Sequence, residues 1–288
     1  MNLPQAIPLP TARPRPFRGD VLTWFAIATL LVLVVLGLIG PILSIGGSST
    51  AIVGPRLSPP DAMWPMGTDS LGRSIVPRVL QGLGTTFVLA TGAVLVTAIF
   101  GTLLGIVAGY LGGILDETVV RAADILFAFP AILFAILVAA ITGPGAPAAV
   151  ASIILVTIPL LTRVVRASTL VIADRDFIIS ARVEGAGLPR IVVAHLLPNV
   201  AGSAIVQATY AVSVGMLVEG GISFLGLGVQ PPQASLGSLL REGSIYLTIA
   251  PWVALAPGLL LAFAILSVDL LGDGLRDSLE PREVRTLR

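Results

Sequence analysis

Three carboxylates lie within or at the edges of long apolar segments: Asp124, Glu219 and Asp269. An ionised carboxylate in such a segment is costly unless it is paired or hydrated, so each is a candidate for an ion or proton pathway. Here the three are scattered near segment ends, which favours capping or ion pairing, and Arg121 stands three residues from Asp124 as a partner. A proton relay, which would make the chain an ion-driven secondary transporter, is kept as the alternative.

The side chains that most catalytic and metal sites require are missing from this chain. It has no cysteine, a single histidine at His195 and no lysine, because all 17 basic residues are arginine. These absences exclude disulfides, thiolate chemistry, a Cys/His zinc site and the lysine of a phosphate-binding P-loop. We therefore predict no catalytic residue, no metal site and no bound cofactor, and we disfavour a membrane-embedded enzyme. If ATP and Mg²⁺ drive the protein, another chain binds them.

The overall composition indicates a lipid bilayer as the environment. Of the 288 residues, 55% are hydrophobic and only 11% are charged, which does not suit the surface of a soluble globular domain. The formal net charge is +1, so the chain lacks the strongly basic surface of a nucleic-acid-binding protein. The predicted fold class is an all-α integral membrane protein with six transmembrane helices.

The six helices are predicted from long apolar intervals, because a membrane-spanning helix needs about 20 largely apolar residues. The stretch Gly143-Pro144-Gly145-Ala146-Pro147 divides one such interval into two spans, since no continuous helix tolerates it. The N-terminal tail is 1–20, the loop between spans four and five is 168–199, and the C-terminal tail is 273–288. The spans are predicted at about 21–43, 85–109, 119–141, 148–167, 200–222 and 250–272.

Arginines set the predicted orientation, because basic residues are retained on the cytoplasmic side of a membrane. If the N-terminus is inside, the inner segments carry 12 arginines and the outer segments carry 4, with Arg121 at a span boundary left uncounted. Both termini and the loop 168–199 are therefore predicted to be cytoplasmic. The inner arginines are Arg13, Arg15, Arg18, Arg163, Arg166, Arg175, Arg182, Arg190, Arg276, Arg282, Arg285 and Arg288, and the outer ones are Arg56, Arg73, Arg78 and Arg241.

The most polar interior segment runs from Asp174 to Leu197. Its first part has helical periodicity, Gly185 and Gly187 end that helix, and Pro189 suits the first turn of a second short helix. From the residues alone two interpretations stay open. The segment is either a solvated loop whose arginines enforce topology, or a docking element for a cytoplasmic partner.

Glycine recurs every fourth residue at Gly101, Gly105 and Gly109. This spacing removes side chains from one helix face, so that another helix can approach closely, either within the chain or from a second subunit. On the outer side, 67–78 and 236–246 are predicted to form short helices at the membrane surface, the first with Asp69 near Arg73.

The segment 174–199 resembles the cytoplasmic signature loop of ABC importer permeases, whose pattern is Glu-Ala-Ala, three residues, Gly, nine residues, Ile, one residue, Leu-Pro. The matching residues, which include the His-x-Leu-Pro-Asn ending of the peptide-importer variant, are Ala181, Gly185, His195, Leu197, Pro198 and Asn199. Ile179 and Ser180 depart from the pattern, because the family has Glu and Ala at these positions. The loop geometry is expected to persist, while one charge contact to the ATPase is lost or replaced.

The resemblance extends from about Trp64 to Arg282. On the basis of this resemblance, the chain is similar to the C-type permease subunits of dipeptide, oligopeptide or nickel ABC importers. Such a subunit lies in the bacterial inner membrane with a homologous second permease, two cytoplasmic ATPase subunits that bind ATP and Mg²⁺, and an extracytoplasmic substrate-binding protein. The further blocks that carry the resemblance are 66–73, 108–113, 124–130, 223–232 and 270–277.

The resemblance implies that this chain forms half of a translocation pathway for small peptides and works by alternating access. Nickel chelates and glutathione stay as alternative substrates. The residues expected to couple the chain to the ATPases are Arg175, Asp176, Phe177, Ser180, Ala181, Arg182, Gly185, Ala186, His195, Leu197 and Pro198. Those expected at the outer gate or at the binding protein are Phe224, Leu225 and Gln230.

Overall fold

The computed structural model describes residues 21–43, 45 and 47–279, and over these residues it is built of α-helices and one π-helical turn. The only strand-like pairings in this part of the chain are two isolated bridges, Ile52 with Arg73 and Thr68 with Ser74. The predicted tail 1–20 and the last nine residues of the predicted tail 273–288 lie outside the described residues. So do six arginines of the orientation argument, namely Arg13, Arg15, Arg18, Arg282, Arg285 and Arg288.

Five helical segments are long and apolar enough to cross a membrane. They confirm the all-α membrane class, and a sixth crossing follows if a bent helix pair is taken as one span. In the fourth segment, a short helix and the π-helical turn lead directly into α8, Leu197–Phe224. The five segments are α1, Val21–Ile39; α2, Ile75–Leu111; α5, Ala146–Ala173; the run Leu188–Phe224; and α10, Trp252–Leu279.

The third predicted span, 119–141, differs from the structure. Two helices take its place, α3 at Gly113–Ala128 and α4 at Ala131–Thr142, and they are bent by 92° relative to each other. Phe129 has extended backbone angles and Pro130 follows it. A proline disfavours helical geometry in the residue before it and has no N–H to donate, so the helix ends here.

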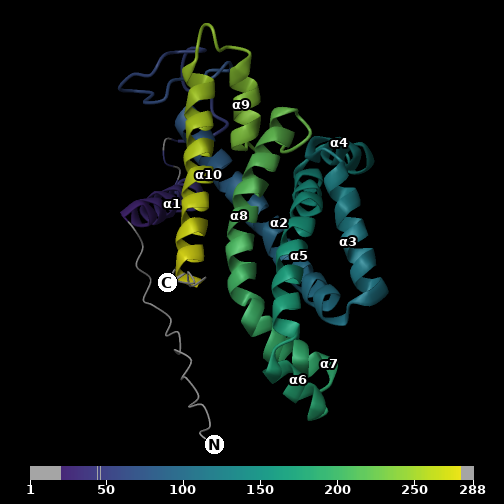
Figure 1. The fold of residues 1–288 in the computed structure, drawn as a ribbon. Helices are drawn as coiled ribbons and strands as arrows, with labels where there is room; N and C mark the ends of the chain where they lie inside the picture. Colours follow the sequence, from purple (N-terminus) through teal and green to yellow (C-terminus); the bar gives the residue numbers. More distant parts are fainter. Residues whose placement is uncertain (1–20, 44, 46, 280–288) are drawn as a thin grey trace, which may run out of the picture.

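The long helices pack around α2 and α8, as Figure 1 shows. Helix α2 packs most extensively on α5, while α8 contacts α5 and α10. Helix α1 lies against α2 and α10. By contrast, the bent pair of α3 and α4 lies at the side of the bundle and contacts mainly α5, α2 and α8.

The bundle has two ends that carry different short helices (Figure 1). Helix α6, Asp176–Val183, and helix α7, Leu188–Ile191, lie at one end, called the α6 end below. Helix α9, Leu236–Ser244, lies at the other, called the α9 end. The end of α10 belongs to the α6 end, because a Cβ built on Gly202 of α8 would lie 3.8 Å from Leu279.

Candidate functional site

The loop at the α6 end folds as two short helices joined by a tight turn. Helix α6 ends where Gly185 adopts a φ of +81°, a conformation that glycine takes without steric cost. The Ala186 amide then donates to the Ala181 carbonyl at 3.0 Å and closes the turn. Helix α7 begins with Pro189 in its first turn, and a π-helical turn at Val192–Leu196 connects it to α8. The two predicted short helices are therefore present.

One face of this loop is part of the protein core. The side chains of Ile178, Ile191 and Leu196 are 0%, 2% and 0% exposed. They belong to one buried cluster with residues of α2, α5 and α8. The loop is therefore a packed extension of three long helices. The other core residues of this cluster are Ile106, Leu161, Val165, Val200 and Ala204.

The other face of α6 is open and carries two exposed apolar side chains. Ile179 and Val183, four residues apart and hence on one helix face, are 48% and 83% exposed. Of the predicted coupling residues, Ala181 is buried, and Ala186 and His195 are half-buried. The exposed ones are Arg175, Asp176, Phe177, Ser180, Arg182, Gly185, Leu197 and Pro198.

Aromatic contacts connect α6 to its neighbours. The Arg182 guanidinium carbon lies 5.3 Å from the ring centre of Tyr110, near the end of α2, within the range of a cation–π interaction. The rings of Phe177 and His195 are 6.4 Å apart. In the part of the chain that the structure describes, His195 lies in no group of three or more His, Cys, Asp or Glu residues that could hold a metal ion.

Ion pairs join the bent pair to α5 at this end. The Arg166 side chain bonds Asp116 through two nitrogens, with Nη2 2.6 Å from Oδ2. Asp124 is paired with Arg163, and Arg121 pairs with Glu117 at 3.7 Å. The predicted pair of Arg121 with Asp124 is therefore wrong. Asp124 faces α5, which a spacing within one helix cannot indicate.

The glycines of α2 lie at its closest contact with α5. A Cβ on Gly105 would lie 2.8 Å from the Thr162 carbonyl oxygen, and one on Gly109 would lie 2.9 Å from the Arg166 carbonyl oxygen. Gly101 faces Leu161, where a Cβ would meet Cδ2 at 3.0 Å. The small residues thus permit backbone approach within the chain.

At the α9 end, four charged side chains form one network. Asp69 accepts from Arg73 Nε and from Arg78 Nη1, both at 2.7 Å, and Arg78 also donates to Glu242 of α9. Asp69 and Arg73 lie close together, as predicted. The predicted short helix 67–78 is wrong in its first part, because 67–74 is a turn with bridge pairs and the helix begins only at Ile75. Arg78 and Glu242 are 164 residues apart, and no local pattern in the sequence indicates their contact.

The residues predicted at the outer gate lie at the end of α8 and in the loop that follows it. Phe224 and Leu225 are 44% and 45% exposed. Gln230 is exposed, and its Nε2 donates to the carbonyls of Gly226 and Gly228 at 3.0 and 2.9 Å. The amide side chain therefore holds its own loop in shape. The predicted surface helix 236–246 corresponds to α9, whose Leu236 and Leu239 are buried.

For the two remaining carboxylates the sequence predicts capping or ion pairing, and the structure shows them hydrogen-bonded to hydroxyl groups. Glu219 is wholly buried and accepts hydrogen bonds from the hydroxyls of Thr86 and Ser223. Asp269 accepts from the hydroxyl of Ser213, which connects α10 to α8. Neither forms a salt bridge with an arginine in the part of the chain that the structure covers. Neighbouring helices supply hydroxyl groups instead.

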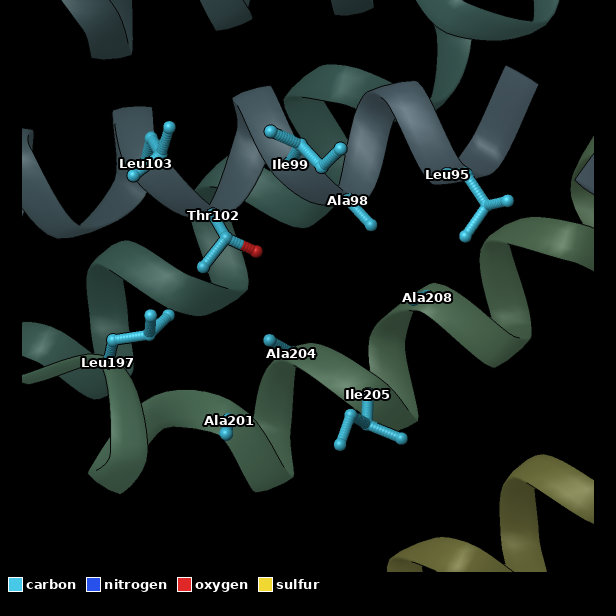
Figure 2. Close-up of a pocket in the computed structure, with 10 residues that line it drawn as sticks. All are labelled: Leu95, Ala98, Ile99, Thr102, Leu103, Leu197, Ala201, Ala204, Ile205 and Ala208. Atoms are coloured by element: carbon cyan, nitrogen blue, oxygen red, sulfur yellow. The ribbon is translucent and has the colours of Figure 1, made fainter. Parts of the chain in front are cut away.

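An open apolar groove of about 410 Å³ lies between α2 and α8. Figure 2 shows that it is lined by residues of α2 between Leu95 and Leu103 and of α8 between Leu197 and Ala208. Thr102 contributes the only hydroxyl, and none of the lining residues is charged.

Comparison with known proteins places this chain in a transporter family. Residues 101–285 match the family described as "Binding-protein-dependent transport system inner membrane component". A glutathione transport system permease protein of Pectobacterium atrosepticum is 42% identical over 224 residues, which are 78% of this chain and 74% of the relative. A dipeptide transport system permease protein of Alkalihalophilus pseudofirmus is 37% identical over 251 residues, 86% of this chain and 82% of the relative. A dipeptide permease protein of Haemophilus influenzae is 37% identical over 217 residues, 75% of this chain and 74% of the relative. The chain therefore belongs to the family of binding-protein-dependent transport system inner membrane components, and it is a permease subunit of an ABC importer.

Proposed function

We propose that this permease pairs with a homologous second permease and receives force from two ATPase subunits through α6 and α7. The observation that carries the proposal is the division of α6 into two faces. Ile178 is buried in the core, while Ile179 and Val183 are exposed and apolar on the other face. A docking surface joined to the bundle by a packed core transmits force, which a free loop would not. ATP and Mg²⁺ are bound by the partner chains, and this chain provides the moving pathway.

The long helices can carry such a movement from one end of the bundle to the other. Helix α2 has 37 residues, and at 1.5 Å per residue it is about 55 Å long. Its last turns contact the α6 end through Ile106 and Tyr110, and its first turn contacts α9 through Arg78. A displacement at α6 therefore reaches the opposite end along one helix, as alternating access requires.

The orientation we propose places the α6 end in the cytoplasm. Arginines at both ends are paired with acidic residues, namely Arg163 and Arg166 at the α6 end and Arg73 and Arg78 at the α9 end. The α6 end carries in addition the three arginines of the loop, Arg175, Arg182 and Arg190. Basic residues favour the cytoplasmic side. Both termini are then cytoplasmic, and the α9 end faces the substrate-binding protein.

Small peptides are the substrate class that we propose. The relatives include dipeptide permeases and a glutathione permease, and glutathione is itself a small peptide. The uncharged groove between α2 and α8 suits a substrate that a binding protein has already selected, because strong binding inside the membrane would slow release. Uptake assays with labelled dipeptides, competed by glutathione or by a nickel chelate, distinguish the substrates. Competition by the nickel chelate alone would contradict a peptide substrate.

Charge on the exposed face of α6 tests the coupling proposal. Val183→Asp and Ile179→Asp leave Ile178 and the core unchanged, so the fold should persist while ATPase docking is weakened. The matched control is Ile245→Asp, which makes the same type of change at a residue 74% exposed just beyond α9. We expect the α6 variants to lose co-purifying ATPase and ATP-driven uptake in proteoliposomes by about ten-fold or more. Unchanged ATPase association, or transport by this chain without any ATPase, would contradict the proposal.

A further inference from the structure

Glu219 lies five residues before the end of α8 and is 0% exposed. Its Oε2 accepts from the Thr86 hydroxyl of α2 at 2.8 Å, and its Oε1 accepts from the Ser223 hydroxyl at 2.6 Å. The Thr86 hydroxyl in turn accepts the backbone N–H of Leu236, the first residue of α9, at 3.2 Å. One buried carboxylate thus connects three helices, α2, α8 and α9. A buried carboxylate within a membrane domain calls for a functional account.

The hydrogen bonds around Glu219 have a defined direction. Each of the two hydroxyl oxygens accepts a backbone N–H from the segment 229–236, at 3.2 Å. A hydroxyl has a single proton to donate, and here the carboxylate is its acceptor. Glu219 therefore organises two amides of the outer segment through two hydroxyls. The pairs of amide and hydroxyl are Leu236 with Thr86, and Val229 with Ser223.

The backbones around this cluster are in direct contact. A Cβ on Gly237 of α9 would lie 2.3 Å from the Gly220 carbonyl oxygen of α8. A Cβ on Gly82 of α2 would lie 3.0 Å from the Ser235 carbonyl carbon. The other end of α9 is held by Glu242, which accepts from Arg78 of α2 at 2.7 and 3.0 Å. Helix α9 is therefore fixed to α2 at both of its ends.

We propose that Glu219 is a positioning residue that fixes α9 to α2 and α8, so that these three helices move as one rigid unit during transport. The inference rests on the proposed function, because it concerns how the pathway opens and closes at the α9 end. In this arrangement α9 does not open as an independent lid. The outer end of the pathway opens only when α2 and α8 move, and both helices are packed on the coupling loop.

Single introduced cysteines test this, because the chain has none of its own. Leu236→Cys and Leu239→Cys report on the buried face of α9, where the side chains are 0% and 4% exposed. Ile245→Cys, at a residue 74% exposed, is the matched control. Each variant is assembled into the complete importer in proteoliposomes and treated with a membrane-impermeant maleimide from the α9 side, at rest and during ATP turnover.

We expect Ile245→Cys to be labelled in both conditions and the two buried cysteines to be labelled about ten-fold more slowly in both. If either buried cysteine is labelled as fast as the control during turnover while transport continues, α9 swings out and the inference is overturned. That outcome leaves the proposed function intact. Failure of ATP-driven transport in every variant and in the unsubstituted importer would instead contradict the proposed function.

The role of the carboxylate itself is tested by Glu219→Gln in the Leu239→Cys chain. A glutamine has one acceptor oxygen in place of two, so the hydroxyl cluster is no longer satisfied. We expect faster labelling at position 239 and fewer substrate molecules transported per ATP hydrolysed, with ATPase subunits still bound. Glu117→Gln, at a side chain 70% exposed on α3, is the control. If Glu219→Gln and its parent, the Leu239→Cys chain, show equal labelling and transport equally many substrate molecules per ATP, the positioning role of Glu219 is overturned. If Glu219→Gln fails to assemble, the labelling of the Leu239→Cys chain during turnover still decides whether α9 moves with α2 and α8.

Discussion

The Arg78 guanidinium donates to both carboxylate oxygens of Glu242, with Nη1 2.7 Å from Oε2 and Nη2 3.0 Å from Oε1. The same Nη1 lies 2.7 Å from Oδ2 of Asp69. One arginine of α2 thereby joins α9 to the turn that precedes α2. Arg78 is only 5% exposed, so its charge depends on these two acidic partners.

Replacing Arg78 should destabilise the permease strongly. Arg78→Gln removes the bidentate partner of Glu242 and one of the two arginines that pair with the buried Asp69. Breaking a buried ion pair on one side costs about 3 kcal/mol. Thermal unfolding followed by intrinsic tryptophan fluorescence measures the effect, since the chain has 3 tryptophans. Arg56→Ala, at an exposed residue on the same side, is the control and should unfold like the unsubstituted chain. Equal unfolding temperatures for the two variants would show that the network contributes nothing.

The two glycines between α6 and α7, Gly185 and Gly187, should respond differently to alanine. Gly185 has a φ of +81°, which alanine adopts at a cost of about 1 kcal/mol or more, whereas the φ of Gly187 is −69°. Nothing lies within 4 Å of a Cβ at Gly185, so strain alone distinguishes the pair. We expect Gly185→Ala to lower thermal stability and ATP-driven uptake, and Gly187→Ala to leave both near the original values. The reverse order would contradict the turn geometry.

Helix α2 should tolerate alanine at one glycine and reject it at another. A Cβ on Gly105 would lie 2.8 Å from both the Thr162 carbonyl oxygen and the Val165 Cβ, so α2 and α5 must separate. Such overpacking costs about 1 to 3 kcal/mol. Gly92 of the same helix has nothing within 4 Å of its Cβ position. We therefore expect Gly105→Ala to unfold at a lower temperature and Gly92→Ala to unfold at the same or a higher one, because alanine favours the helix. Two equal shifts would indicate that α2 and α5 are not in tight contact.

The ion pair of Asp116 with Arg166 should be recoverable by exchanging its charges. Asp116→Arg and Arg166→Asp each place like charges together between α3 and α5, and each should lower the free energy of unfolding by about 1 kcal/mol. The double variant restores an opposite pair and should regain most of the loss. Glu117→Arg is the control, because its side chain and that of Arg121 are 70% and 74% exposed and form only a long contact. A double variant that is no better than the singles would show that the two side chains do not interact.

The sequence by itself determined the membrane class, the long helices and the two short helices of the loop at the α6 end. These follow from local information: apolar length, the position of glycine and proline, and spacing along one helix. The contact of Asp69 with Arg73 also lies within reach of such reasoning, since the residues are four apart. The break of the third span at Phe129 and Pro130 carried a local signal as well, but the apolar run on both sides favoured a continuous helix.

Only the tertiary structure decided which distant groups meet. Arg78 reaches Glu242 across 164 residues, Glu219 reaches Thr86 across 133, and Asp124 pairs with Arg163 on another helix and not with Arg121 on its own. In an apolar environment a buried polar group takes whichever partner the helix packing brings to it. Packing depends on the summed shape of many side chains, so the partners of the buried charges follow from the assembled bundle and not from any one segment.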